Sequence, residues 1–260
     1  MCQLYRRHEL RNTKYELRIL KMKVPIFKSL IIYEDDNLVV VNKPPFISSL
    51  DDRNGETINM LRLARAEFED IQVCHRIDRE TSGALIFAKN PETYRNVSMQ
   101  FEHREVNKIY HAIVDGQHRF EELVVDLPIG IGSKGMVRID RAEGKPADTT
   151  FNTIQLFKHY SLLECKPKTG RMHQIRIHLA TQRAPITGDD LYHGKPFYLS
   201  KVKRGYKLSK DQEELPIMKR FALHAKQVGF KLMNGEPILI DAPYAKDFDT
   251  AIKMLQKFDL

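Results

Sequence analysis

The segment 84–89 constrains the fold more than any other part of the sequence, because it is apolar in all but its last residue. A strand with apolar residues on both of its sides is buried on both sides, so we expect it at the centre of a β-sheet. The segment 72–77 before it has the composition of a short strand, in which Arg76 and Asp78 would project from one face. Between them, residues 81–83 (Thr-Ser-Gly) are a turn signal.

Arg76 and Asp78 would therefore lie at the mouth of a buried strand pair, where charged groups are costly to place. One interpretation is a structural ion pair on a loop. The other is a functional pair, because perturbed charges gather at active sites. These residues alone favour neither.

Further strands and helices are predicted by apolar patterning between turn signals. Because successive strands are often joined by short turns rather than crossover helices, we expect an α+β fold with a largely antiparallel, mixed β-sheet and flanking helices. The expected strands are 30–33, 38–42, 107–116, 122–127, 136–139, 148–156, 160–166, 228–233 and 236–240, and the expected helices are 56–68, 91–104 and 245–258.

The segment 167–180 (P-K-T-G-R-M-H-Q-I-R-I-H-L-A) fits two structures. As a helix from Met172, its apolar residues share one side and Arg176 falls in the middle of that side. As a strand, it places Gln174, Arg176 and His178 on one face. An arginine directed into an apolar face needs an acid, since breaking a buried pair costs on the order of 3–5 kcal/mol. Periodicity does not decide between the two.

The amino-acid composition limits the possible binding partners of the protein and the cellular compartment in which it works. The 260-residue chain is 42% hydrophobic and has a formal net charge of +8, which favours a polyanion such as nucleic acid, or secondarily an anionic membrane. Three widely spaced cysteines without a C-x-x-C motif argue against a disulfide framework or a cysteine zinc site. No apolar run reaches the roughly 20 residues of a membrane span, and the N-terminus does not resemble a signal peptide. We therefore expect a soluble, cytoplasmic protein.

A family resemblance adds to these predictions. The segment 75–85 (H-R-I-D-R-E-T-S-G-A-L) resembles the signature H-R-L-D-x-x-T-S-G of the RluA-type RNA pseudouridine synthases, with Ile77 in place of the usual leucine. Residues 31–45, the K-x-Y at 108–110, the G-R-x-H-Q-I-R-x-H at 170–178 and the segment 221–225 are also similar to family motifs. Met172 departs from the usual threonine or serine. Together the similar segments span about 29–245.

The resemblance implies a pseudouridine synthase fold with an active-site cleft across its middle, and an isomerase that converts uridine to pseudouridine in ribosomal or transfer RNA. It implies that Asp78 is the catalytic aspartate, that Arg76 helps to turn the uridine out of the stack, and that Tyr110 lies against the base. It also implies that 170–178 opens a helix and that Arg176 pairs with Asp78. The other residues expected to bind the substrate are His75, Thr81, Ser82, Gly83, Lys108, Arg171, His173 and Gln174. The reaction needs no cofactor and no metal, and we expect a monomer.

The expected organisation is a basic extension over 1–28 followed by a catalytic domain over 29–260. Relatives often carry a small RNA-binding domain ahead of the catalytic one, and 1–28 is too short to hold a complete one. A second basic run contains Tyr198 and Tyr206 among its cations, which are Lys195, Lys201, Lys203, Arg204, Lys207 and Lys210. Such a run is typical either of a solvated loop or of a surface that follows a phosphate backbone.

Three other functions remain to be weighed. A glycoside hydrolase needs two carboxylates, for which the sequence offers Asp78 and Glu80, but the arginine-rich surroundings suit RNA better than a neutral sugar. A metal enzyme would recruit His75, Asp78, His173 and His178, although the last two histidines lack the spacing of H-E-x-x-H. A non-catalytic RNA-binding module explains the charge but not an inward Arg176 beside a retained Asp78.

Overall fold

The computed structural model describes residues 24–51, 57–132, 135–209 and 212–260. Most of the basic extension, residue 56 at the start of the helix expected over 56–68, and Lys210 lie outside the described residues.

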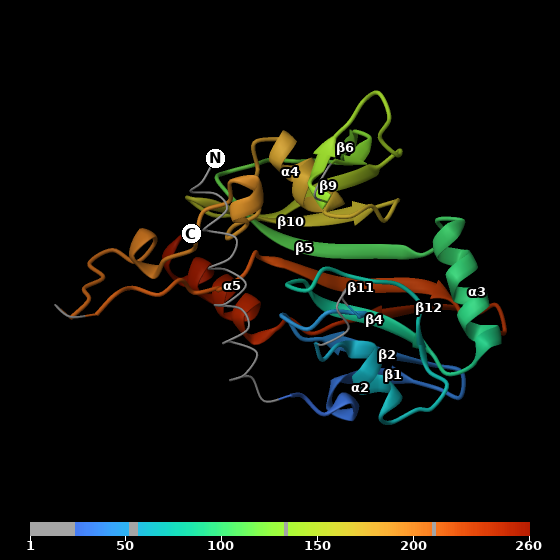
Figure 1. Ribbon diagram of the computed structural model, residues 1–260. Helices are drawn as coiled ribbons and strands as arrows, with labels where there is room; N and C mark the ends of the chain where they lie inside the picture. The colour runs from blue at the N-terminus through green and yellow to red at the C-terminus, as the bar shows by residue number, and fades with distance from the viewer. Residues whose placement is uncertain (1–23, 52–56, 133–134, 210–211) are drawn as a thin grey trace.

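A ten-stranded sheet runs through the described part of the molecule in the order β1-β2-β4-β11-β5-β10-β9-β6, with β12 paired to β11 and β3 to β4 (Figure 1). A separate hairpin, β7-β8, stands apart from it. The strands are β1 (Ile31–Glu34), β2 (Leu38–Lys43), β3 (Gln72–Val73), β4 (Ser82–Ala88), β5 (Asn107–Asp115), β6 (Leu123–Asp126), β7 (Ile129–Ile131), β8 (Val137–Ile139), β9 (Asp148–Leu156), β10 (Tyr160–Pro167), β11 (Leu223–Lys231) and β12 (Pro237–Asp241).

The predicted central strand is confirmed, because every residue of β4 is buried. Successive side chains point to opposite faces of a strand. Accordingly Leu85 and Phe87 join the core under helix α2 (Met60–Arg65), while Ala84 and Ile86 join the core on the side of helix α3 (Pro91–Glu102). The continuous apolar run in the sequence therefore corresponds to a strand that packs on both of its faces.

The two halves of the sheet meet at a short parallel contact between β4 and β11. Only Ser82 and Gly83 pair with His224 and Ala225, and beyond them β4 continues beside β2 and β3 while β11 continues beside β5 and β12. The other pairings in this sheet of the described chain are antiparallel. The sheet thus divides next to the Arg76–Asp78 segment.

The Thr-Ser-Gly turn expected at 81–83 is wrong in position. The chain turns earlier, where the Thr81 amide donates to the Asp78 carbonyl, and Ser82 and Gly83 already belong to β4. Gly83 has φ +114°, and a Cβ there would lie 2.1 Å from the Ala225 carbonyl oxygen. Glycine is therefore required by the close approach of two strands and not by a loop.

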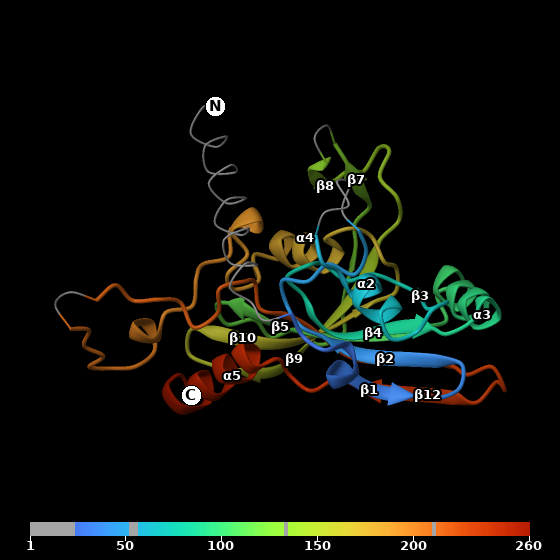
Figure 2. The ribbon, with the colours of Figure 1, turned by 60° about the horizontal axis from the view of Figure 1, so that its bottom comes forward.

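The helices cover both faces of the sheet, with α2 and α4 (Gln174–Thr181) on one side and α5 (Lys246–Phe258) on the other (Figure 2). Helix α3 begins as predicted, with Asn90 capping the Thr93 amide and Pro91 in the first turn. Helix α2 begins later than predicted, at Met60, because Asn59 supplies its cap by accepting from the Arg62 amide. No helix among the described residues is long and apolar enough to cross a membrane.

Two further predictions needed correction. The strand expected over 72–77 is only Gln72–Val73, so the segment from Cys74 to Glu80 is irregular and does not alternate as assumed. Strand β7 was missed, because three residues give too short a pattern to recognise.

Replacing Gly83 with alanine should destabilise the fold far more than the same change at Gly235. A Cβ at Gly83 meets the Ala225 backbone, whereas Gly235, at φ +85°, has open space around its Cβ position. Overpacking and backbone strain each cost about 1–3 kcal/mol, so we expect a loss of roughly 2–6 kcal/mol for Gly83→Ala and about 1 kcal/mol for Gly235→Ala. Urea unfolding of the two variants measures the difference, and equal losses would contradict the close approach.

Candidate active site

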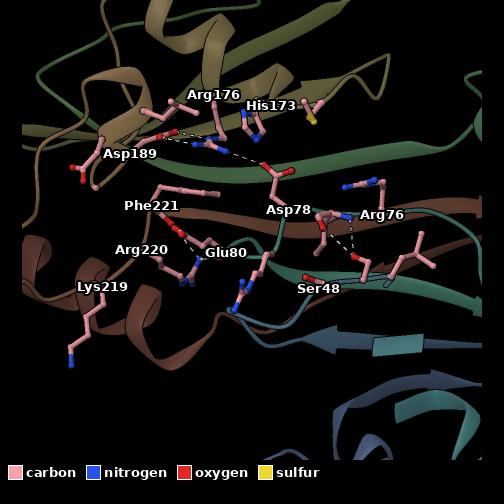
Figure 3. A pocket seen from close by; sticks show the side chains of 18 of the residues that line it. Ser48, Arg76, Asp78, Glu80, His173, Arg176, Asp189, Lys219, Arg220 and Phe221 are labelled. Carbon is pink, nitrogen blue, oxygen red and sulfur yellow. Dashed lines mark hydrogen bonds and ion pairs between the residues drawn. The ribbon is translucent and has the colours of Figure 1, made fainter. Parts of the chain in front are cut away.

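A buried arginine with two carboxylate partners lies at the centre of the site (Figure 3). Arg176 Nε and Nη2 donate to the two carboxylate oxygens of Asp189 at 2.6 and 2.8 Å, while Nη1 lies 3.5 Å from Asp78 Oδ2. The expected Arg176–Asp78 pair is therefore present, but Asp189 is the closer, bidentate partner. The Asp189 side chain is 1% exposed and that of Asp78 is 28% exposed, so Asp78 is the more accessible of the two carboxylates.

Helix α4 supplies Arg176 and resolves the ambiguity between helix and strand. All residues from Gln174 to Leu179 are buried, so the segment has no polar face for periodicity to reveal. Arg176 is additionally packed between aromatic rings, with its guanidinium carbon 4.3 Å from the Phe221 ring centroid and 5.1 Å from that of Tyr192. Burial acts to lower the pKa of Arg176, but the hydrogen bonds and charge of Asp189 and the charge of Asp78 raise it.

Lysine 43 fixes one side of the irregular segment that carries Asp78. Its fully buried ammonium donates to the carbonyls of Pro44, Ile47 and Arg79 at 3.0, 2.8 and 3.1 Å. The Phe46 amide also donates to the Arg79 carbonyl. Burial, followed by the charge of Arg220, holds the pKa of Lys43 well below its usual range. These bonds anchor the backbone next to Asp78.

Arginine 220 fixes the other side of the same segment. It is 2% exposed and forms a bidentate pair with Asp247 of α5 at 2.7 and 3.0 Å. It also donates to the Glu80 carbonyl at 2.9 Å and to Ser82 Oγ at 3.0 Å. The turn after Asp78 is therefore tied to the C-terminal helix.

Two cavities, of about 510 and 560 Å³, lie on either side of the Asp78 segment. Asp78, Arg76, Ile77, His173 and Arg176 line both of them. Figure 3 shows Asp78 between Arg176 and Arg76. The first cavity is completed by polar residues that include Ser48, Arg79, Glu80 and Lys219, and the second by Thr81, Arg104, Lys108, Tyr110, Arg171 and Leu223.

The second cavity brings together most of the residues singled out from the sequence. Asp78, Tyr110 and Arg176 line it jointly, and so do His75, Thr81, Lys108, Arg171, His173 and Gln174. Tyr110 comes from β5, and burial together with the charge of Asp78 raises the pKa of its hydroxyl. Lys108, two residues earlier on the same strand, has its pKa lowered to about 8 by burial and by the charge of Arg104.

Several expected substrate-binding residues instead use their polar atoms within the protein. Gln174 bonds to Thr169, the Arg171 amide, the Asp148 carbonyl and Thr149. Ser82 Oγ accepts from Arg220 and bonds to His224, and Gly83 packs on Ala225; neither Ser82 nor Gly83 lines a cavity described here. We assign Gln174, Ser82 and Gly83 to the frame of the site.

Two of the three histidines considered as metal ligands are likewise engaged. His178 bonds through Nδ1 to Thr149 and through Nε2 to the Leu127 carbonyl, at 3.0 and 2.9 Å. His75 Nε2 accepts from the Ile86 amide at 3.1 Å, and its ring stacks on Phe101. Burial lowers the pKa of His75 to about 3, which keeps the ring neutral. Both residues are used in packing the site.

Sequence reasoning missed Asp189, Lys43 and Arg220. An inward arginine does need an acid, but the family resemblance indicated only Asp78 as that acid. Asp189 follows a glycine turn, and Gly188 takes φ +82° there. The available signal was a single aspartate after Thr-Gly, which also fits an ordinary turn.

Asp78 is therefore an accessible carboxylate beside a guanidinium whose charge is compensated mainly by Asp189. Such a carboxylate can act as a nucleophile or a base while the positive charge of Arg176 stays beside it. The adjoining tyrosine and leucine provide apolar surface for a planar group, and exposed arginines and Lys108 provide positive charge for a polyanion.

Comparison with known proteins identifies the class. The family model for RNA pseudouridylate synthase matches residues 37–181. The chain is 33% identical over 240 residues to the ribosomal large subunit pseudouridine synthase C of Vibrio vulnificus, covering 90% of this chain and 71% of that protein. It is 32% identical over 241 residues to the protein of the same name from Escherichia coli K12, covering 90% and 72%.

The fold agrees with a solved structure as well. The human RNA pseudouridylate synthase domain containing 4 protein superposes with a TM-score of 0.66 at 24% identity, over 88% of this chain and 95% of that one. The α+β fold expected from the sequence is thus confirmed.

The chain belongs to the RNA pseudouridylate synthase family, as the resemblance in the sequence indicated. It is accordingly an isomerase that acts on uridine in RNA.

Replacing Asp189 with asparagine should leave the buried charge of Arg176 without its bidentate partner. Removing one member of a buried pair costs about 3–5 kcal/mol, so we expect a loss of that order in the free energy of unfolding. Asp249→Asn is the control, because its pair with Lys253 is exposed at the surface and should change stability by less than about 1 kcal/mol. Urea unfolding measures both, and an unchanged Asp189→Asn protein would show that Asp78 alone compensates Arg176.

Proposed function

We propose that this protein isomerises specific uridines in structured RNA with Asp78 as its catalytic group, and that RNA of the large ribosomal subunit is the first substrate to test. The names of the curated relatives suggest that RNA, and transfer RNA remains the second candidate. We assign residues 29–260 to the catalytic unit, because the strands from Ile31 to Asp241, apart from the β7-β8 hairpin, share one sheet that α5 covers.

The single observation that carries the assignment of Asp78 is its position. It is the partly exposed carboxylate between two cavities, next to a cation that is itself bound to Asp189. Pseudouridine formation breaks the N1–C1′ bond of uridine, turns the uracil and forms a C5–C1′ bond. These steps need an ionised carboxylate close to the ribose in a site shielded from water, and the positive charge of Arg176 favours that ionised form.

The target base must leave the stack before it can reach Asp78. In our proposal the uracil enters the second cavity and stacks on Tyr110, opposite Leu223. Arg76 is exposed at the entrance to both cavities and fills the gap that the base leaves. Lys108, Arg171 and His173 then face the ribose and phosphates of the flipped nucleotide.

Replacing Asp78 with asparagine should abolish pseudouridine formation while RNA binding persists. The amide keeps the shape of the side chain but can act neither as a nucleophile nor as a base. RNA from a strain lacking the gene is incubated with wild type, Asp78→Asn or the surface control Asp249→Asn, and its pseudouridines are mapped. We expect defined uridines to convert with wild type and Asp249→Asn only, which would also identify the substrate.

Conversion by Asp78→Asn at the wild-type rate would refute the catalytic assignment. If none of the three proteins converts any uridine, yet each binds RNA with a steep salt dependence, the protein acts instead as a non-catalytic RNA-binding module.

The low pKa of Lys108 predicts a pH-dependent RNA affinity. The charged form attracts phosphate, and with a pKa of about 8 the side chain is fully charged at pH 6.5 but only about a quarter charged at pH 8.5. Affinity for RNA should therefore fall by up to about four-fold as the pH rises across that range. Lys108→Arg keeps its charge throughout and should lose this dependence. A binding titration at the two pH values tests it, and the same pH dependence in wild type and variant would exclude Lys108 as its source.

A further inference from the structure

A long excursion leaves the body of the protein between Asp189 and Arg220. We call the described residues 190–209 and 212–219 the arm. Figures 1 and 2 both show this orange segment extending away from the sheet. Its two ends are attached to the buried ion pairs Asp189–Arg176 and Arg220–Asp247, which hold Asp78 from either side.

The base of the arm is fixed to the core. Phe197, Val202 and Met218 are buried in the main hydrophobic cluster, and the Ile217 amide donates to the Phe197 carbonyl at 2.8 Å. The arm is therefore anchored near both of its ends, so a ligand bound along it would be held at a defined position relative to the site.

The outer part of the arm is cationic. Lys201, Arg204 and Lys207 are exposed, and Lys203 is half-buried. Within the described chain none of these four forms an ion pair with an acid. Lys201 and Lys203 lie over the rings of Tyr198 and Tyr206, each 5.9 Å from the centroid. The nearby acid Glu214 accepts from the Ser200 amide. The positive charge of the arm is thus available to an outside anion.

The arm also adjoins the catalytic cavity. Asp190 and Leu191 at its start and Lys219 at its end line the first cavity together with Asp78. Figure 3 shows Lys219 on the opposite side of this cavity from Arg76, with its side chain directed away from Asp78. A strand whose flipped base lies near Asp78 would meet these cations as it leaves the cavity.

We propose that the arm is a docking surface for the phosphate backbone of the RNA substrate, outside the site that holds the target uridine. The inference rests on the proposed function, because it takes the RNA at Asp78 and the RNA on the arm to be one molecule. Exposed cations spaced along a segment suit phosphates, and the tyrosines among them add aromatic rings on which single-stranded bases can stack. Because the arm is fixed and is joined to both ion pairs that hold Asp78, it sets where the bound RNA lies relative to the site.

The test compares two triple variants that remove the same charge. The arm variant is Lys201→Gln, Arg204→Gln and Lys207→Gln. The control variant is Arg65→Gln, Arg95→Gln and Lys231→Gln, three exposed cations on α2, α3 and the end of β11. Helices α2 and α3 lie away from the arm in Figures 1 and 2. Because all six side chains are at the surface, urea unfolding should give both variants the wild-type stability.

Affinity for the full-length substrate RNA is measured as a function of salt concentration. Each phosphate contact contributes about 0.7–0.9 to the slope of log affinity against log salt. The arm variant should therefore lose about 2–3 from that slope and bind at least tenfold more weakly in dilute salt, while the control variant stays close to wild type. At saturating RNA all three should convert uridine at the same rate. On a short stem-loop that carries only the target uridine, the arm variant should bind like wild type.

An arm variant with the wild-type slope on long RNA would overturn the proposal, and so would equal losses in the arm and control variants. A loss on vesicles of anionic lipid but not on RNA would assign the arm to a membrane surface instead. Failure of the proposed function gives a different result: wild type would bind RNA without converting any uridine, whatever the arm variant does to the slope.

Discussion

The charge of Arg176 inside the protein is the constraint on which the geometry around Asp78 depends. A buried guanidinium needs compensating acid, and Asp189 supplies it with two short hydrogen bonds. Asp78 is then left as a second, longer-range partner at 3.5 Å. This division keeps Asp78 close to a positive charge through one longer contact instead of a bidentate pair, so the carboxylate remains available to a substrate.

The position of Asp78 is set by the backbone on both sides of it, since its own segment has no regular structure. Lys43 gathers three carbonyls at one side, and Arg220 holds Glu80 and Ser82 at the other. Lys43 ends β2 beside β4, and Arg220 lies just before β11, so the two cations flank the contact at which Gly83 allows β4 and β11 to touch. The opening in the sheet and the placement of Asp78 therefore have a common structural cause.

The sequence revealed those parts of the fold and site that depend on local patterns. Two-sided apolarity predicted the central β4, and apolar patterning between turn signals predicted the start of α3 at Pro91 and the adjacent strands 228–233 and 236–240, which overlap the paired β11 and β12. Helix α4 gave no such pattern because it is buried all round. Asp189 was missed for a similar reason, because a buried acid in a turn looks like any turn aspartate until its distant partner is known. Which side chains pair across a long sequence separation depends on the tertiary fold, and the periodicity of the sequence does not encode it.

The cations of the chain divide into two groups with different physical roles. Lys43, Arg176 and Arg220 are buried, and their charges are met by carbonyls or carboxylates of the protein itself. They cannot contribute much to attracting RNA, because their fields are compensated within a few ångströms. The formal charge of +8 must therefore act through surface residues, and solvent-exposed charges work over only about a Debye length, some 8–10 Å in physiological salt. Cations that guide RNA into the site have to stand close to its path, as those around the second cavity and along the arm do. A change in total charge elsewhere on the surface should accordingly matter less than the same change at these two places.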